Sequence, residues 1–357
     1  MTDVSERPVT ARDEVDFYAP QLPWFAPGLV LVIAASFAAL VWLLAGVGFA
    51  GSVVLAWLLL AVALPLWSVL LEGRRKAVDR AAGVMIWSAF GLAMIPLVSL
   101  VYTVVSKGVG ILSAQFFGSS MRGILGEGGG IHHAIFGTLI ITGLATLISV
   151  PIGVLAAVYL IEYGRGHRLA RIITFLVDVM TGIPSIVAGL FAYALFVLVA
   201  GPGVRMGFGG AVALSVLMIP IVVRASEEMI KLVPDELREA AYALGVPKWR
   251  TITKVVLPTA VAGIVTGVTL AIARVAGETA PLLIIAGLTS GDNFNPFAER
   301  MATLPVFIFY SIQEPGVYVD EMTDYAWGAA LVLVIIVMTL NVAARVLGSF
   351  FAPKSGR

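Results

Sequence analysis

The sequence lacks cysteine and is poor in charged residues, and both features narrow what the chain can be. Without cysteine, a disulfide framework, a thiolate metal site and a cysteine nucleophile are excluded. Charged residues make up 13% of the 357 residues, about half the share in an average soluble domain. The formal net charge is only +1, so no nucleic-acid partner is expected.

Catalytic motifs are also missing. The sequence contains no G-x-x-x-x-G-K-[ST], H-E-x-x-H or G-x-S-x-G pattern, and the glycine-rich stretch 126–130 has no lysine to follow it. We therefore expect no catalytic residue and no cofactor bound by this chain. The pair His132 and His133 has neither cysteine nor a spaced carboxylate motif beside it, so no metal site is predicted.

Apolar residues are abundant. They form 59% of the chain, and the mean hydropathy is +0.99, which is typical of an integral membrane protein in a lipid bilayer. A helix needs about 20 apolar residues to cross the hydrocarbon core. Eight segments are candidates: 29–49, 52–71, 82–105, 132–161, 170–200, 209–223, 259–288 and 326–349. Of these, 209–223 is short and is the weakest candidate.

The distribution of lysine and arginine predicts the orientation. Basic residues gather after the second, fourth and sixth segments, with four at 74–80, three at 165–171 and six at 224–254, while the alternate connections have few. Eight spans with both termini in the cytoplasm satisfy this bias at every connection. The polar segment 1–28 contains four prolines and is predicted to be a cytoplasmic tail rather than a cleaved signal peptide.

The longest polar interruption in the second half of the chain has its own helical signals. Pro234 is followed by two acidic residues, which favour a helix start, and Gly245 stands where a helix C-cap is expected. A second short helix is predicted over 248–256, ending before Pro258. The stretch 228–258 is therefore interpreted as a helix–glycine–helix element between two spans.

This stretch resembles the EAA loop of binding-protein-dependent type I ABC importer permeases. The residues that carry the resemblance are Glu239, Ala240, Ala241, Gly245, Leu257 and Pro258. Val255 departs from the family, which usually has isoleucine there. The resemblance implies that the loop docks on a separate ATP-binding subunit and passes its motion to the pore, with ATP and Mg²⁺ bound by that partner. An ordinary cytoplasmic helical hairpin is the alternative.

Further motifs resemble the phosphate-specific branch of that family, and within it the PstA-type subunit more than the PstC-type. They are Gly137-Thr138-Leu139, Pro151-x-Gly153, Ala156-Ala157-x-Tyr159-Leu160-x-Glu162-Tyr163, Gly182-Ile183-Pro184-Ser185-Ile186-Val187-x-Gly189-Leu190, Ala276-Gly277-Glu278-Thr279-Ala280-Pro281-Leu282-Leu283 and Thr303-Leu304-Pro305-Val306. The resemblance implies an all-α polytopic fold of about eight transmembrane helices, in which a six-helix core follows an added N-terminal pair.

The expected organisation follows from these assignments. The segments are a cytoplasmic tail at 1–28, an additional transmembrane pair with its basic loop at 29–80, the first core span with an outer amphipathic segment at 81–131, the transmembrane domain at 132–349, and a second tail at 350–357. No residue in 29–71 is charged, so a packing or lipid-facing role is favoured for the added pair.

Three charged residues lie within apolar segments. Arg274 and Glu278 are four apart and are predicted to share one helix face, about 24 Å of helix beyond Pro258. They form either a structural ion pair or, with Ser185 and Thr279, part of a translocation pathway in which the arginine fork binds an oxyanion. Asp178 is the third; pairing with a base from a cytoplasmic loop is favoured over a pathway role.

The resemblance implies a permease for inorganic phosphate in a bacterial cell membrane that works by alternating access. The expected partners are a PstC-type permease subunit, two copies of an ATP-binding subunit and an extracytoplasmic phosphate-binding protein. Two alternatives stay open. One is a permease for another oxyanion such as sulfate or molybdate, and the other is an ion-coupled secondary transporter or channel that uses Asp178 and Glu278 for protons.

Overall fold

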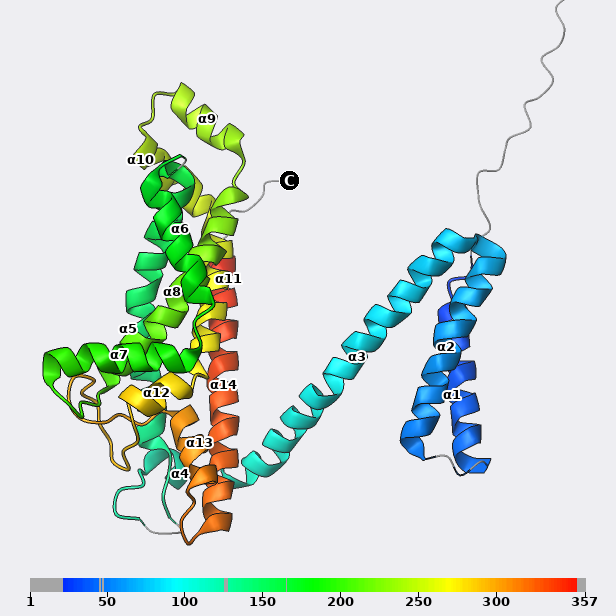
Figure 1. Ribbon diagram of the computed structural model, residues 1–357, viewed down its shortest axis with the longest axis horizontal. Coiled ribbons are helices and arrows are strands. Elements are labelled where there is room, and N and C mark those ends of the chain that lie inside the picture. Colours follow the sequence, from blue (N-terminus) through cyan, green and yellow to red (C-terminus); the bar gives the residue numbers. More distant parts are fainter. Residues whose placement is uncertain (1–21, 45, 47, 125–127, 165, 352–357) are drawn as a thin grey trace, which may run out of the picture. The chain divides into compact units, whose positions relative to one another are not determined.

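The structure is a computed structural model that describes residues 22–44, 46, 48–124, 128–164 and 166–351. Within these ranges the regular structure is helical and no strand occurs, which confirms the predicted all-α class. The chain divides into two compact units, residues 1–101 and 102–357, which are described separately. The helices are labelled in Figure 1.

The N-terminal unit contains α1 (Ala26–Leu44), α2 (Phe49–Glu72) and most of α3 (Arg74–Gly108). The face that α1 turns toward α2 has a small or medium-sized side chain at every fourth position, and these are buried: Ala26, Val30, Ala34 and Ala38. Small side chains allow two helices to approach closely in lipid, where no hydrophobic force drives them together.

Two predicted boundaries of this unit are wrong. The basic stretch 74–80 is not a loop but the first turns of α3, because only Gly73, with φ +87°, separates α2 from α3. The predicted tail at 1–28 ends earlier than expected, since α1 already begins at Ala26; residues 1–21 lie outside the described part of the chain. The predicted pair of apolar helices is present.

The C-terminal unit holds the rest of α3 and all later elements. They are a 3₁₀ turn at Val109–Ile111, α4 (Ala114–Gly118), α5 (His132–Val158), a π-helical segment at Tyr159–Tyr163, α6 (Arg168–Thr181), α7 (Ser185–Ala200), α8 (Gly207–Lys231), α9 (Asp235–Ala243), α10 (Lys248–Thr251), a second π-helical segment at Ile252–Val256, α11 (Leu257–Ala276), α12 (Ala280–Ile285), α13 (Leu304–Gln313) and α14 (Val319–Phe351). Helix α14 thus extends into the predicted tail at 350–357.

Helix α8 forms the centre of this unit, although its sequence is the weakest candidate span. It runs for 25 residues instead of the predicted 15, and 56% of its apolar window is buried, a larger share than in any other candidate span that is described. Its core face, from Ala211 to Val222, packs on α5, α11 and α12. Glycine, alanine and serine lower its hydropathy but let neighbouring helices approach, which explains why a short apolar run marks the core.

The predicted single span 170–200 is broken. Helices α6 and α7 meet at an angle of 112°, and α7 lies across the long helices of the unit (Figure 1). Pro184 cannot continue α6, because it has no amide hydrogen to donate within a helix. It stands directly before α7, where the amide would have no helical partner in any case. Gly189 of α7 sits against the Pro281 backbone: a Cβ there would be 2.6 Å from the Pro281 Cα. The bend therefore brings two of the motif segments together.

The apolar stretch 259–288 is also interrupted. Helix α11 ends at Ala276, and α12 begins separately at Ala280 with Pro281 in its first turn. At its other end α11 is continuous with α10 through the π-helical segment, as a run of 29 residues from Lys248 to Ala276. Seven of the described helices are long and apolar enough to span a membrane. If α6 and α7 are counted together as one bent span, the total is eight, which is the predicted number.

Candidate functional site

The helix–glycine–helix element lies at one end of the C-terminal unit, and α13 lies at the opposite end (Figure 1). Pro234 caps α9 at its start. At its end, Gly245 has φ +74°, and the amide of Val246 donates to the Ala241 carbonyl over 3.1 Å. This is the left-handed cap that glycine favours. The predicted turn at Gly245 is present, but the second helix is not separate, because α10 continues into α11.

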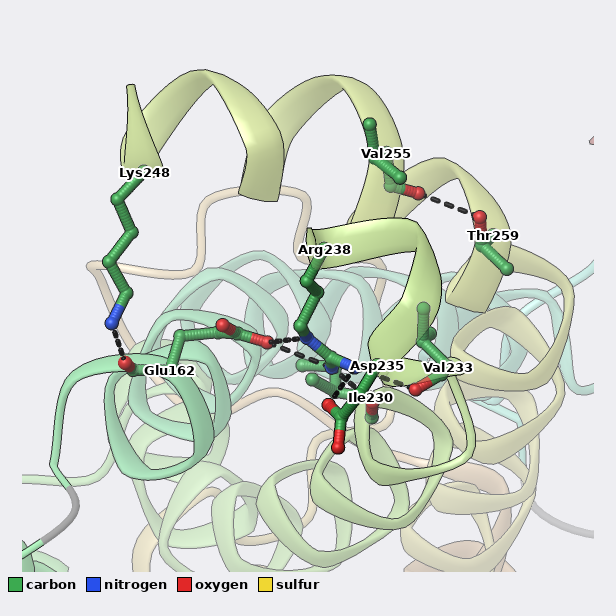
Figure 2. A network of polar contacts seen from close by, with 8 residues as sticks. All are labelled: Glu162, Ile230, Val233, Asp235, Arg238, Lys248, Val255 and Thr259. Carbon is green, nitrogen blue, oxygen red and sulfur yellow. Dashed lines mark hydrogen bonds and ion pairs between the residues drawn. The ribbon is translucent and has the colours of Figure 1, made fainter. Parts of the chain in front are cut away.

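Arg238 holds α9 against the end of α5, as Figure 2 shows. Its Nε and Nη2 atoms lie 3.0 and 2.9 Å from Glu162 Oε1, in the π-helical segment that follows α5. The same guanidinium donates to the carbonyls of Ile230 and Val233 and to the Asp235 carboxylate. The Arg238 and Glu162 side chains are only 11% and 5% exposed. This pair and its carbonyl partners form a clasp between α5, α8 and α9.

Lys248 adds a second connection to the same end of α5. Its Nζ donates to the main-chain carbonyl of Glu162 and lies 4.9 Å from the centre of the Tyr163 ring. Because Lys248 is the first residue of the run that becomes α11, the ends of α5 and α11 are tied through one residue (Figure 2). The π-helical segments on both sides of this contact are a type of irregularity frequent at functional sites.

The outer face of the element is exposed in this chain. Glu239 and Ala240 face outward, whereas Ala241 is buried. The same helix–glycine–helix element also exposes four large apolar side chains, which are Leu237, Tyr242, Leu244 and Trp249. An apolar group of this kind with charged neighbours is typical of a protein-docking surface. Leu257 and Pro258 lie at the start of α11, where Leu257 packs on the buried cluster around Val256.

Three of the five intramembrane candidates, Ser185, Arg274 and Glu278, meet at the bend between α6 and α7. A cavity of about 280 Å³ is lined by Ser185 at the start of α7, by Pro220 of α8, and by Arg274 and Glu278. The prediction that Arg274 and Glu278 share a helix face is wrong, because α11 ends at Ala276 and Glu278 stands in the turn beyond it. No ion pair joins them. Thr279 is outside the lining and precedes α12.

Arg274 is exposed in this chain, and within the described residues it has no hydrogen-bonded or ionic side-chain partner. Its guanidinium therefore keeps its donors available at the cavity. Ser185 of the lining is also the first residue of α7, and the amide groups of Ser185 and Ile186 donate to no helical carbonyl, as at every helix start. The cavity thus combines a cation, a hydroxyl and a helix N-terminus, and Glu278 is its acidic member.

Asp178 is not part of that cavity. Its carboxylate contacts the guanidinium of Arg224, whose other terminal nitrogen lies 2.7 Å from Glu227. Both partners belong to α8, so the contact joins α6 to the central helix. Arg224 was assigned to a loop in the sequence because the apolar run stops at residue 223, whereas α8 continues to Lys231.

No functional role follows from the sequence for four residues whose side chains form these contacts, which are Glu162, Arg238, Arg224 and Glu227. One available signal was spacing, since Arg224 and Glu227 are three apart and can share a helix face. Glu162 and Arg238 are 76 residues apart, so no local pattern could connect them. Elsewhere, His132 Nδ1 lies 2.8 Å from Asp292 Oδ1, and the described residues include no group of three side chains suited to hold a metal.

Comparison with known proteins gives a consistent result. Residues 149–357 match the family "Binding-protein-dependent transport system inner membrane component". The phosphate transport system permease protein PstA 1 of Mycobacterium tuberculosis (strain H37Rv) is 46% identical over 279 residues, which are 77% of this chain and 88% of that protein. PstA of Yersinia pestis is 40% identical over 293 residues, or 80% of this chain and 96% of that protein.

Solved structures share the fold. A chain of a bacterial alginate ABC transporter in complex with a pentasaccharide-bound periplasmic protein superposes with a TM-score of 0.56 at 14% identity, and covers 78% of this chain and 97% of its own. A chain of the MetNI methionine ABC transporter in an inward-facing conformation gives 0.50 at 20% identity, with 68% and 100% covered. At these identities the likeness concerns the fold alone.

Proposed function

Because this chain belongs to the family of binding-protein-dependent transport system inner membrane components, we propose that it is the permease subunit of an ATP-driven importer of inorganic phosphate. The observation that carries the proposal is the similarity to PstA proteins of two bacterial species over 88% and 96% of their length. The chain is a multi-pass membrane protein by its seven or eight apolar helices.

The cavity at the α6–α7 bend supports an anionic substrate. A charged side chain inside an apolar span is costly unless it meets water or an opposite charge, roughly 3 kcal/mol on the lenient insertion scale. Arg274 has no such partner among the described residues, and a phosphate oxygen would supply one through the planar fork. The amides at the start of α7 would add neutral donors. We assign Arg274, Ser185 and Glu278 to the pathway, with Thr279 beside them.

The continuous helix from Lys248 to Ala276 supports coupling. It begins at the docking surface beside Trp249 and ends in the turn that carries Arg274. A displacement of α9 and α10 by a partner would therefore be transmitted along this continuous helix to the cavity. In this scheme Glu239, Ala240 and Gly245 belong to the docking surface, with Ala241 buried beneath them, Leu257 and Pro258 start α11, and the Arg238–Glu162 clasp links the surface to α5.

The proposed assembly pairs this chain with a homologous PstC-type permease subunit in a bacterial cell membrane, with both termini in the cytoplasm. Two ATP-binding subunits dock on the cytoplasmic side, one of them on the α9–α10 surface of this chain, and bind ATP and Mg²⁺, since this chain shows no P-loop sequence. An extracytoplasmic phosphate-binding protein delivers the substrate. ATP-driven closure of the ATP-binding pair switches the cavity between the two sides of the membrane.

The proposal is tested in proteoliposomes that contain this chain with a PstC-type permease subunit and the ATP-binding subunit, supplied with the phosphate-binding protein. Uptake of radiolabelled phosphate should require ATP and the binding protein, and should stop when the ATP-binding subunits carry an inactive Walker B site. An excess of sulfate or molybdate should leave uptake unchanged. Uptake driven by a proton gradient without ATP would instead identify a secondary transporter, and competition by sulfate or molybdate would identify another oxyanion as substrate.

A further inference from the structure

The N-terminal unit has a cavity of about 620 Å³ that the proposed transport cycle does not use. All three helices of the unit contribute to its apolar wall, with Leu31 from α1, Leu60 and Leu64 from α2, and Val84 from α3. The candidate spans of α1, α2 and α3 are only 17%, 11% and 6% buried. An apolar groove between helices that otherwise face hydrocarbon is suited to hold an acyl chain.

One end of this groove is polar. Arg80 and Asp79 of α3 line it there. Arg80 is held in place by Glu72, whose side chain is 1% exposed. Arg80 Nε lies 2.7 Å from Glu72 Oε2, and Arg80 Nη2 lies 2.9 Å from Glu72 Oε1. Glu72 in turn accepts from the Ser68 hydroxyl and the Leu22 amide. The guanidinium is therefore fixed at the rim, and its Nη1 atom has no hydrogen-bond partner in the described part of the unit.

Charge at this end is strongly positive. Arg74, Arg75 and Lys76 occupy the turn of α3 that precedes Asp79 and Arg80, and none of the three forms an ion pair with a described residue. Glu72 is matched by Arg80, which leaves three positive charges against Asp79. The positive-inside rule places this end of α3 at the cytoplasmic leaflet, where anionic lipids concentrate. Basic pockets between membrane helices on that side bind anionic head groups.

We propose that this groove is a binding site for an anionic phospholipid of the cytoplasmic leaflet. Its phosphate lies at the rim formed by Arg80 and the 74–76 cluster, and one acyl chain fills the space between α1, α2 and α3. Trp87, which lines the cavity and is 74% exposed, covers the apolar part from the lipid side. The lipid thereby connects the added N-terminal helices to the membrane that surrounds the transporter.

Two glycines of α3 provide a matched test. Gly83 lines the cavity and Gly91 does not, and at both positions an added Cβ would meet no heavy atom within 4 Å. The full chain is purified in detergent and titrated with phosphatidylglycerol or with phosphatidylcholine of the same acyl chains, and bound lipid is counted by native mass spectrometry. Gly83→Leu should weaken binding of phosphatidylglycerol at least about tenfold, and Gly91→Leu should leave it unchanged.

A further variant tests the head group. Changing Arg74, Arg75 and Lys76 to glutamine should lower the preference for phosphatidylglycerol over phosphatidylcholine by about tenfold or more, because each base near the surface contributes to anionic binding. The Arg80–Glu72 ion pair, which joins α2 to α3, is left unchanged in this variant. Gly28→Leu changes the wall that α1 contributes to the groove, and it should weaken binding of phosphatidylglycerol as Gly83→Leu does. Agreement between the two variants would show that the effect does not come from a local disruption of α3.

Other occupants give different results. Equal binding by Gly83→Leu and Gly91→Leu, or no preference between the two lipids, would overturn the proposal. If bound lipid increased only after removal of residues 1–21, the groove would belong to the chain's own N-terminal segment. If a cysteine at position 83 formed a crosslink to the partner permease in the assembled complex, while lipid left it unprotected, the groove would be a protein interface.

Discussion

Arg238 and Arg274 are the same residue type in two regions of one unit, and their surroundings are opposite. Arg238, in α9, is 11% exposed and donates to two carboxylates and two carbonyls. Arg274, in the last turn of α11, is exposed in this chain and has no side-chain partner within the described ranges. All the nitrogen atoms of the Arg238 guanidinium donate hydrogen bonds within the chain, whereas the donors of the Arg274 guanidinium are available to a partner from outside the chain.

The difference separates a charge that the fold uses from one that we propose to be functional. A buried arginine is tolerated only when its donors are satisfied, and Arg238 meets that condition within its own chain. Arg274 stands in an apolar helix without meeting it, so the condition must be met by water, by the partner subunit or by a passing anion. Substitutions at the two positions should therefore affect different quantities, stability in the first case and transport in the second.

The largest effect is expected at the clasp. Arg238→Met removes the partner of Glu162, which is only 5% exposed, and leaves a buried carboxylate unpaired. Such a loss typically costs about 3–5 kcal/mol. We expect a lower melting temperature of the purified chain and weaker retention of the ATP-binding subunits. Thermal unfolding and co-purification measure both.

The clasp has two matched controls. Arg238→Met together with Glu162→Gln removes both charges and should recover most of the lost stability, which a simple packing defect would not. Asp235→Asn breaks the exposed ion pair of the same arginine, whose carboxylate is 73% exposed, and should cost less than about 1 kcal/mol. If all three variants were equally unstable, the ion pair would not be what holds α9.

At the cavity, the expected effect is on uptake. Arg274→Gln with Glu278→Gln leaves no buried charge behind, so the complex should assemble and hydrolyse ATP normally. Loss of a charge-assisted hydrogen bond to the substrate costs about 1.5–3 kcal/mol, which is about ten- to a hundredfold in phosphate uptake. Arg274→Lys keeps the charge without the fork and should fall in between. Wild-type uptake in the double variant would remove Arg274 from the pathway.

A smaller effect is expected at the turn between α9 and α10. Gly245 has φ +74°, which a β-branched residue adopts only at a cost of about 1–2 kcal/mol, so Gly245→Val should loosen the docking surface. We expect partial uncoupling of ATP hydrolysis from uptake, measured as phosphate transported per ATP. Asn is the next best residue in this conformation, so Gly245→Asn should behave nearly as the wild type. Full coupling in Gly245→Val would show that the turn is not required.

The smallest structural change tests orientation. The chain has no cysteine, so single cysteines report cleanly. Ser226 and Thr251 are fully buried and would resist labelling for that reason alone, whereas Tyr242 on the docking surface and Ser290 after α12 are both exposed. In whole cells an impermeant thiol reagent should label Ser290→Cys and not Tyr242→Cys. The reverse pattern would contradict the proposed topology.

Local patterns in the sequence determined several features of the protein correctly. The all-α class follows from apolar composition, since lipid leaves the backbone few ways to satisfy its hydrogen bonds. The start of α9 at Pro234 and its end at Gly245 depend on φ angles and on nearby amides, which neighbouring residues set. The resemblance to phosphate permeases rests on short contiguous motifs, and the relatives named above bear it out.

Only the tertiary structure decided how the charges are arranged. Hydropathy made 209–223 the weakest span, yet the small residues that lower it are what allow α8 to be the core. A break of α11 at Ala276 placed Glu278 off the helix face of Arg274, because the following turn and Pro281 interrupt the helix. The bond between Arg238 and Glu162 joins residues 76 positions apart, and its strength depends on burial, which is a property of packing and not of local sequence.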